Sequence, residues 1–265
     1  MKFLRVINPE NSQPVYGVLR SDRIYLLDRS ALDGGKETGL VIMRQQVKTF
    51  LPPVEPPNII ALGLNYRQHA QESGKPVPTS PVIFLKATTS LVGHLSPVVL
   101  PREAPAEVDY EAELVVVIGK KAKRVSEKEA LEYVFGYTCG NDISARDCQL
   151  RVDQQWARGK SFDSFAPVGP WVETDLDPNN LKIRLALNGQ TMQDSSTGDM
   201  IFPVPKIVSY LSQQMTLLPG TIIMTGTPSG VGFARQPPVF LKPGDVLEVE
   251  IEGIGCLRNH VVAEG

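Results

Sequence analysis

The fold is decided by DYEAELVVVIG, residues 109–119. Successive side chains of a β-strand point to opposite faces, so Glu111 and Glu113 would project together from one face while Ala112 and Leu114 point the other way. Residues 114–118 are all apolar, which is typical of a strand that is covered on both sides. The stretch therefore predicts two carboxylates that share one side at the start of a buried strand.

Two carboxylates at such a place need a compensating charge. Unit charges about 5 Å apart repel by roughly 3 kcal/mol at an effective dielectric constant of about 20, before any desolvation cost. A divalent cation with oxygen ligands, Mg²⁺ or Mn²⁺, would offset this repulsion; the alternative is a solvated acidic strand end. LEVEIEG, residues 247–253, is an internal control, because Glu248, Glu250 and Glu252 alternate with apolar residues and predict a strand with one wet face and no ligand role.

Composition narrows the class of protein. The 265 residues are 42% hydrophobic and 21% charged, which is ordinary for a globular protein. A net charge of -2 provides no electrostatic footprint for nucleic acid or an anionic membrane. The three cysteines, Cys139, Cys148 and Cys256, have no CxxC spacing, and no apolar run approaches the ~20 residues of a membrane span. We expect a cytoplasmic protein that acts on a small molecule, with no nucleic-acid or membrane partner.

The N-terminal part predicts a separate small β unit. Residues 2–8 and 15–28 have the composition of short strands, the second range forming a hairpin that turns at Ser21 and Asp22. LPPVEPP, residues 51–57, can continue neither a helix nor a central strand. We therefore expect a small N-terminal domain, residues 1–55, and a larger domain, residues 56–265.

A histidine and a glutamate follow the first strand of the larger domain. NIIALGLNY, residues 58–66, predicts a buried strand, and His69 and Glu72 are three residues apart in the polar segment after it. One helical turn would put both side chains on the same face, where a carboxylate can orient an imidazole; an exposed helical pair is the alternative. Gly74 and the prolines after it predict a mobile loop, either a lid or a plain connector.

A second candidate segment is YTCGNDISARDCQ, residues 137–149. A strand over residues 137–140 would deliver Asp142 at its end, and a helix with Asp142 or Ser144 near its N-cap would follow. Such a helix places Arg146 and Gln149 on one face, so an acid, a guanidinium and an amide could converge. A surface ion pair of Arg146 with Asp147 is the alternative.

Local signals predict the remaining elements. Residues 126–136 begin with a capping-box pattern, Ser126 and Glu129, and predict a short helix. Asn188 and Gly189 predict a type I′ hairpin turn, and residues 204–217 predict an amphipathic helix. Residues 221–232 predict a buried strand that runs into a glycine-rich loop, which lacks the GKS or GKT of a nucleotide-binding loop. Together the elements predict an α+β fold dominated by strands.

Seven motifs, read together, resemble the fumarylacetoacetate hydrolase superfamily in their order and spacing, from about residue 58 to the C-terminus. They are GLNYRQHAQE, FLK, DYEAELVVVIGK, GNDISARDCQ, GKSFDSFAPVGPW, NGQTMQDSSTGDMIF and TGTPSGVG. The resemblance, closest in kind to acylpyruvate hydrolases and 2-hydroxyhepta-2,4-diene-1,7-dioate isomerases, implies a catalytic domain of mixed β-roll fold, a small N-terminal β-containing domain and a homodimer. One departure is Ala87, which follows FLK where the family usually has proline.

The resemblance also implies roles for individual residues. It implies a Mg²⁺ or Mn²⁺ site made by three carboxylates, a substrate site for a small 2-oxo acid, and catalytic groups on a lid. The implied metal ligands are Glu111, Glu113 and Asp142; the implied substrate-binding residues are Arg146, Gln149, Lys160 and Thr227; the implied catalytic residues are His69, Glu72 and Lys160.

We expect from this resemblance a hydrolase that cleaves a C–C bond in a 2,4-dioxo acid of the acylpyruvate or fumarylpyruvate type. His69, oriented by Glu72, would take a proton from the attacking water, and the cation would stabilise the departing enolate. The alternative is an isomerase, tautomerase or decarboxylase that acts on 5-carboxymethyl-2-hydroxymuconate, 2-hydroxyhepta-2,4-dienedioate or oxaloacetate. A metal-free binding protein on the same fold is the non-enzyme alternative.

Overall fold

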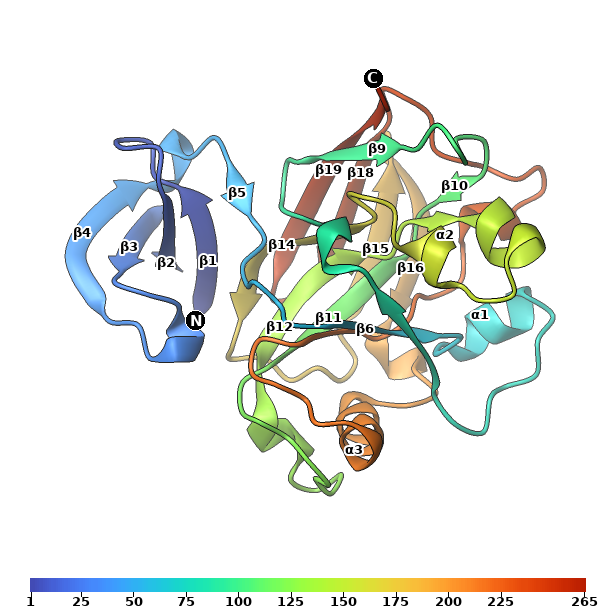
Figure 1. Cartoon of the computed structure of the whole chain (residues 1–265), viewed down its shortest axis with the longest axis horizontal. Coiled ribbons are helices and arrows are strands. Elements are labelled where there is room, and N and C mark those ends of the chain that lie inside the picture. Colours follow the sequence, from blue (N-terminus) through green and yellow to red (C-terminus); the bar gives the residue numbers. More distant parts are fainter.

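Strands dominate the computed structural model, which describes residues 1–265 (Figure 1). A twelve-stranded sheet runs in the order β4-β3-β2-β1-β14-β12-β11-β17-β6-β7, with β5 and β8 paired beside this path. A five-stranded sheet, β16-β15-β18-β19-β9, and a pair of short strands, β10 and β13, complete the β structure. Parallel and antiparallel pairs occur in both large sheets, so the predicted mixed, strand-dominated fold is confirmed.

Strands of the N-terminal unit are the first members of the large sheet, drawn in blue in Figure 1. They are β1 (Lys2–Ile7), β2 (Pro14–Arg20), β3 (Arg23–Leu27), β4 (Glu37–Met43) and β5 (Phe50–Leu51). β1 continues the sheet into the larger part of the chain, because Lys2 pairs with Glu173 and Phe3 with Val172. The predicted domain boundary near residue 55 falls between β5 and the next strand, β6, and stays a prediction.

The strand that the opening stretch predicts, β11 (Ala112–Ile118), lies between β12 and β17 and is buried along its whole length. Leu114, Val116 and Ile118 pack into the larger of two hydrophobic cores, whereas Val115 and Val117 pack into the smaller one. Each buried side chain of this size contributes roughly 1.5–3 kcal/mol to folding. The prediction of a strand covered on both faces is confirmed.

The other strands surround β11 and place its N-terminal end inside the molecule. The large sheet also contains β6 (Ile59–Gly63), β7 (Val82–Lys86), β8 (Leu91–Val92), β12 (Val134–Asn141), β14 (Ala166–Glu173) and β17 (Ile222–Met224). The remaining strands are β9 (Pro97–Leu100), β10 (Val108–Asp109), β13 (Ser144–Ala145), β15 (Lys182–Leu187), β16 (Gln190–Ser196), β18 (Val246–Ile251) and β19 (Gly255–Ala263).

Two predictions about the second sheet are confirmed. Glu250, on β18, is exposed and pairs with Arg184 at 3.0 Å, and Glu248 is half-buried, so this acidic strand has one wet face. Asn188 and Gly189 have φ angles of 53° and 79° between β15 and β16, as a type I′ turn requires.

Helices are few and short. The α-helices are α1 (Arg67–Glu72), α2 (Ala157–Lys160) and α3 (Val204–Gln214). The 3₁₀-helices are Ala31–Asp33, Arg44–Gln46, Thr88–Ser90, Ala130–Tyr133, Thr197–Asp199 and Gly232–Ala234, and Cys148–Val152 is a turn of π-helix. The predicted amphipathic helix is present as α3, which buries Ile207, Val208 and Leu211. None of these helices has the length and apolar character that crossing a membrane requires.

Two predicted helix starts are wrong. Residues 126–136 contain only the 3₁₀-helix Ala130–Tyr133, because the Ser126 hydroxyl donates to the Glu129 carboxylate and no reciprocal bonds to the backbone form. Gly136 belongs to β12, where a Cβ atom would lie 2.5 Å from the carbonyl oxygen of Glu173. After Asp142 the chain first forms β13, and helical structure begins only at Arg146; Asp147 caps the π-helical turn by accepting from the backbone N–H of Cys148 at 2.7 Å.

Candidate active site

Pairing of β11 with β12 brings three carboxylates together. Ala112 lies opposite Asn141, so Glu113 on β11 and Glu111, the residue before β11, lie beside Asp142, the residue after β12. One carboxylate oxygen from each acid lies within 4.8 Å of the others, and all three side chains are buried. The backbone N–H of Asp142 also donates to the carbonyl oxygen of Glu111 at 2.9 Å. This bond fixes the relative position of the three acids, Glu111, Glu113 and Asp142, which together are called the acidic corner. Residues 31 positions apart in the sequence thus converge, as the resemblance to the family implies.

Glu113 is the least compensated of the three acids. Its Oε2 accepts from the backbone N–H of Gly226 at 2.8 Å, whereas its Oε1 is buried without a hydrogen-bond partner. Burial, together with the negative charges of Asp142 and Glu111, raises the pKa of Glu113 well above its usual range. An unpartnered carboxylate oxygen beside two further carboxylates fits a hard divalent cation such as Mg²⁺ or Mn²⁺.

Two buried lysines hold Asp142 from opposite sides. Lys160, at the end of α2, places its Nζ 2.6 Å from Asp142 Oδ2 and 2.8 Å from Glu111 Oε2. Lys86, at the end of β7, pairs with Asp142 Oδ1. Burial lowers the pKa of Lys86 despite the Asp142 carboxylate, whereas at Lys160 Asp142 and Glu111 outweigh burial and raise the pKa.

Arg146 links the acidic corner to the glycine-rich loop. Its Nη2 lies 2.7 Å from Glu111 Oε1, and its Nε donates to Asp109 Oδ2 at 2.9 Å. Its Nη1 donates to Gln149 Oε1 at 2.8 Å, so the predicted shared face of Arg146 and Gln149 is confirmed. Asp109 in turn accepts from the backbone N–H groups of Gly232 and Phe233 at 2.8 and 3.1 Å. The guanidinium is therefore bonded on three sides to the protein and orients Glu111.

The same cations set the charge of Glu111. Burial alone would raise its pKa, but Lys160 and then Arg146 outweigh burial and lower the pKa of Glu111 to about 2. Glu111, just before β11, and Glu113, on β11, thus have pKa values shifted in opposite directions.

His69 and Glu72 form a hydrogen-bonded pair on α1. His69 Nδ1 lies 3.2 Å from Glu72 Oε2, and His69 is buried. The Glu72 carboxylate also accepts from the backbone N–H of Gly230, at 2.9 and 3.1 Å. Backbone N–H groups of the glycine-rich loop therefore bind three carboxylates of the same chain, those of Glu72, Asp109 and Glu113. Nδ1 is engaged with Glu72, which leaves Nε2 of His69 to face other partners.

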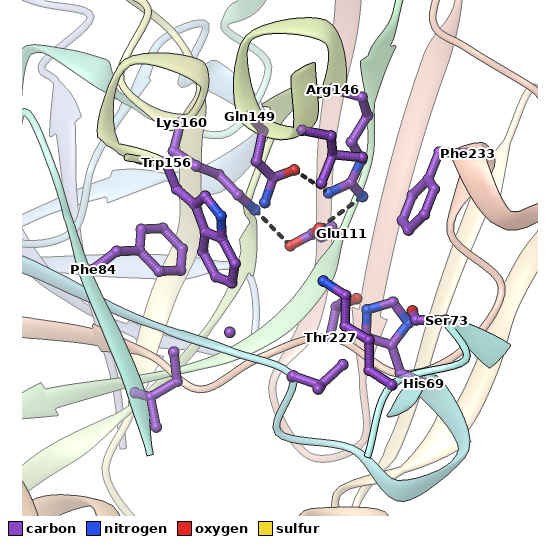
Figure 2. A pocket seen from close by; sticks show the side chains of 15 residues that line it. His69, Ser73, Phe84, Glu111, Arg146, Gln149, Trp156, Lys160, Thr227 and Phe233 are labelled. Carbon is purple, nitrogen blue, oxygen red and sulfur yellow. Dashed lines mark hydrogen bonds and ion pairs between the residues drawn. The ribbon is translucent and has the colours of Figure 1, made fainter. Parts of the chain in front are cut away.

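These groups border one pocket, shown in Figure 2. Glu111 lies between Lys160 and Arg146, with His69 and Thr227 on the opposite side. Thr227 Oγ1 accepts from Gln193 Nε2 at 2.8 Å. Of the residues predicted from sequence, those that line the pocket are His69, Glu111, Arg146, Gln149, Lys160 and Thr227. Glu72, Glu113 and Asp142 lie next to these lining residues.

Several residues at the site have no predicted role. Asp109 and Lys86 complete the ion pairs, and Trp156 packs edge-on against Phe84 with ring centroids 5.6 Å apart, forming an apolar wall. A Cβ atom at Gly63 would lie 2.4 Å from the Trp156 ring, so glycine at the end of β6 leaves room for that wall. In the sequence, Lys86 stands inside the apolar segment of residues 81–87 and is the lysine of the FLK motif, and these are the signals that could have pointed to it.

The chain is similar to known proteins of one family. Residues 58–262 match the family model described as fumarylacetoacetate (FAA) hydrolase C-terminal. Over 226 residues the chain is 47% identical to a protein of Rattus norvegicus named oxaloacetate tautomerase Fahd2a, mitochondrial, covering 84% of this chain and 72% of the relative. A fumarylacetoacetate hydrolase domain-containing protein 2 homolog of Dictyostelium discoideum is 53% identical over 79% of this chain and 72% of its own length.

Solved structures match over the whole chain, N-terminal unit included. A 5-carboxymethyl-2-hydroxymuconate delta-isomerase from Mycobacterium smegmatis has a TM-score of 0.89 at 38% identity and covers 100% of both chains. A 2-hydroxyhepta-2,4-diene-1,7-dioate isomerase from Mycobacterium marinum has a TM-score of 0.87 at 38% identity, covering 100% of this chain and 99% of its own.

Proposed function

Because this chain belongs to the fumarylacetoacetate hydrolase family, we propose that it is a divalent-metal-dependent tautomerase that interconverts the keto and enol forms of a 2-oxo diacid of the oxaloacetate type. The resemblance of its motifs alone favours hydrolysis of a C–C bond. The names of relatives that are 38–47% identical favour tautomerisation or isomerisation instead. The observation that carries the proposal is the acidic corner, with its unpartnered Glu113 oxygen, beside the His69–Glu72 pair.

Glu111, Glu113 and Asp142 would hold the cation. When bound, Mg²⁺ or Mn²⁺ withdraws electrons from a 2-oxo carbonyl and so makes the neighbouring C–H group more acidic. The carboxylate-only ligand set favours these hard cations over zinc, which prefers nitrogen and sulfur.

His69 is the group that we assign to proton transfer. Its Nδ1 is engaged with Glu72, so Nε2 would take the proton from the carbon next to the 2-oxo group and give it back. Lys160 has three N–H donors, of which two are used by Glu111 and Asp142. The third would donate to the oxygen atom that becomes the enol. In the keto-to-enol direction, His69 would deliver to this oxygen atom the proton that it took from carbon, and the reverse transfers would restore the keto form, so no attacking water is consumed.

Part of the pocket wall is apolar. Leu62, Phe84 and Trp156 supply apolar surface beside the charged groups. A hydrolase of the same family would need space for a water molecule between His69 and a second carbonyl, whereas a tautomerase needs only the substrate.

The proposal is tested by following enol oxaloacetate as its absorbance decays, with the protein stripped by EDTA and then supplied with Mg²⁺ or Mn²⁺. We expect metal-dependent acceleration over the buffer rate with oxaloacetate as the only product by NMR, and no pyruvate. A panel of acylpyruvates, fumarylpyruvate and 5-carboxymethyl-2-hydroxymuconate is run alongside. Rapid C–C cleavage of an acylpyruvate, with no effect on the enol, would overturn the proposal in favour of the hydrolase.

Isomerisation of a longer unsaturated diacid is the second candidate. The two isomerases described above match the N-terminal unit as well as the catalytic part, with coverage of 99–100%. The same proton carrier, His69, would serve a proton shift along a conjugated chain. Turnover of 5-carboxymethyl-2-hydroxymuconate faster than that of enol oxaloacetate would favour this candidate.

A further inference from the structure

We propose that Lys75, on the loop after α1, determines specificity by binding the distal carboxylate of a diacid substrate. The inference rests on the proposed function in that it concerns the same pocket, and it assigns a partner to the end of the substrate that does not react. Neither the motifs nor the acidic corner assigns a role to Lys75.

Lys75 differs from the other pocket cations in having no carboxylate partner. Lysine and arginine line the pocket at three positions, Lys75, Arg146 and Lys160. Arg146 is paired with Asp109 and Glu111, and Lys160 with Glu111 and Asp142, at 2.6–2.8 Å. Lys75 forms no ion pair with the protein. A substrate carboxylate can therefore approach it without first breaking an existing pair.

The backbone and one aromatic ring hold Lys75 at the pocket. Its N–H donates to the carbonyl oxygen of Ala70 at 3.0 Å, and Gly74, with φ of +62°, turns the chain at the end of α1. Its Nζ lies 5.8 Å from the centroid of the Trp156 ring. A cation–π contact at this distance is weak, so the ammonium is kept near the apolar wall and remains available to an anion.

Charge balance in the pocket explains why such a cation is needed. The buried cluster contains four acids and three cations, namely Asp109, Glu111, Glu113, Asp142, Lys86, Arg146 and Lys160. Ionised, it has one surplus negative charge, which a divalent cation converts to one positive charge. That charge matches the carboxylate beside the 2-oxo group. A second substrate carboxylate needs a cation of its own, and Lys75 supplies it.

The test compares two ligands that differ only at the distal end. Binding of 2-oxoglutarate and of 2-oxopentanoate, in which a methyl group replaces the distal carboxylate, is measured by calorimetry with Mg²⁺ present. We expect the unmodified protein to bind the diacid about fivefold more tightly, as for a partly exposed ion pair. Lys75→Met should remove this preference, and Lys75→Arg should keep it. Lys121→Met, at an exposed lysine outside the pocket, should leave it unchanged.

Kinetics with oxaloacetate add a second readout. Lys75→Met should raise the KM about fivefold and leave kcat within about twofold, since the reacting carbon is not touched. A diacid preference that survives in Lys75→Met, or that is missing in the unmodified protein, would overturn the role of Lys75. A Lys75-dependent preference in a protein that does not tautomerise oxaloacetate would support this role and refute the proposed function instead.

Discussion

Glu113→Gln should stabilise the metal-free protein and abolish its response to metal. The ligand oxygens of Glu113, Glu111 and Asp142 lie within 4.8 Å of one another. Two unit charges at that distance repel by about 3.5 kcal/mol at an effective dielectric constant of about 20. The nearby Lys160 offsets part of this repulsion, so we expect the neutral amide to raise the free energy of unfolding by about 2 kcal/mol. That corresponds to an increase in Tm of roughly 4 °C or more.

Addition of metal should make the unmodified protein more stable than Glu113→Gln, the reverse of the order expected without metal. A cation at 100 times its Kd adds about 2.7 kcal/mol to the stability of the protein that binds it. The unmodified protein should gain this amount on addition of Mg²⁺, whereas Glu113→Gln should gain little. The measurement is the Tm of each of the two proteins, once in EDTA and once in Mg²⁺.

The stability of the metal-free protein should depend on pH with a definite sign. The pKa of Glu113 is raised in the folded state, so the folded protein keeps a proton that the unfolded chain has lost. Without metal, stability should therefore fall as the pH rises from the usual range of glutamate, about 4.3, toward the raised pKa. Glu113→Gln should lack this fall.

Glu248→Gln, on the wet face of β18, is the matched control and should change stability by no more than about 0.5 kcal/mol. A Glu113→Gln protein that is less stable than the unmodified protein in EDTA would refute the electrostatic reasoning. A Mg²⁺ response that survives in this variant would refute the assignment of Glu113 as a ligand.

Three further predictions follow from the ion pairs. Lys86→Met should lower the free energy of unfolding by about 3 kcal/mol in urea titrations, because it leaves the buried Asp142 with one cation fewer; Lys121→Met should have no measurable effect. Glu111→Gln should remove the acid sensitivity that Glu111 confers: its pKa of about 2 stabilises the fold above the usual glutamate pKa, and this contribution should be lost as the pH falls from about 4.3 to 2. Glu72→Gln should lower kcat for enol oxaloacetate about tenfold, because it weakens the orientation of His69, while the Kd for Mg²⁺ by calorimetry stays unchanged. A Glu72→Gln protein that loses metal binding as well would contradict the separation of lid and metal site.

Sequence pattern predicted correctly those elements that depend on interactions between residues close in the sequence. The apolar run of β11, the Asn188–Gly189 turn and the α3 helix depend on side chains close in sequence, and they were predictable for that reason. Residues 126–136 show the limit. Their capping pattern favours a helix, but pairing of β12 with both β11 and β14 requires an extended chain from Val134 onward. Tertiary pairing there outweighs local preference.

The candidate site could be predicted only in part, for the same reason. Alternation along one strand places Glu111 and Glu113 on one side, but the position of Asp142 depends on the register of β11 with β12. The motif order of the family supplied that information. No role was predicted for Asp109 or Lys86. Their partners, Arg146 and Asp142, are 37 and 56 residues away in the sequence. A charged side chain by itself does not show which distant residue it will contact.

The pairing of charges argues that the cluster serves chemistry rather than stability. Burying an ion pair seldom stabilises a protein more than well-packed apolar side chains of similar volume would. A purely structural cluster would at least be balanced, with one cation for each acid. Here Asp109, Glu111 and Asp142 each contact a lysine or arginine, and Glu113 alone is left with a backbone N–H and an unpartnered oxygen. The surplus carboxylate is costly without a further positive charge, and a divalent cation at the three acids is the group that would offset it.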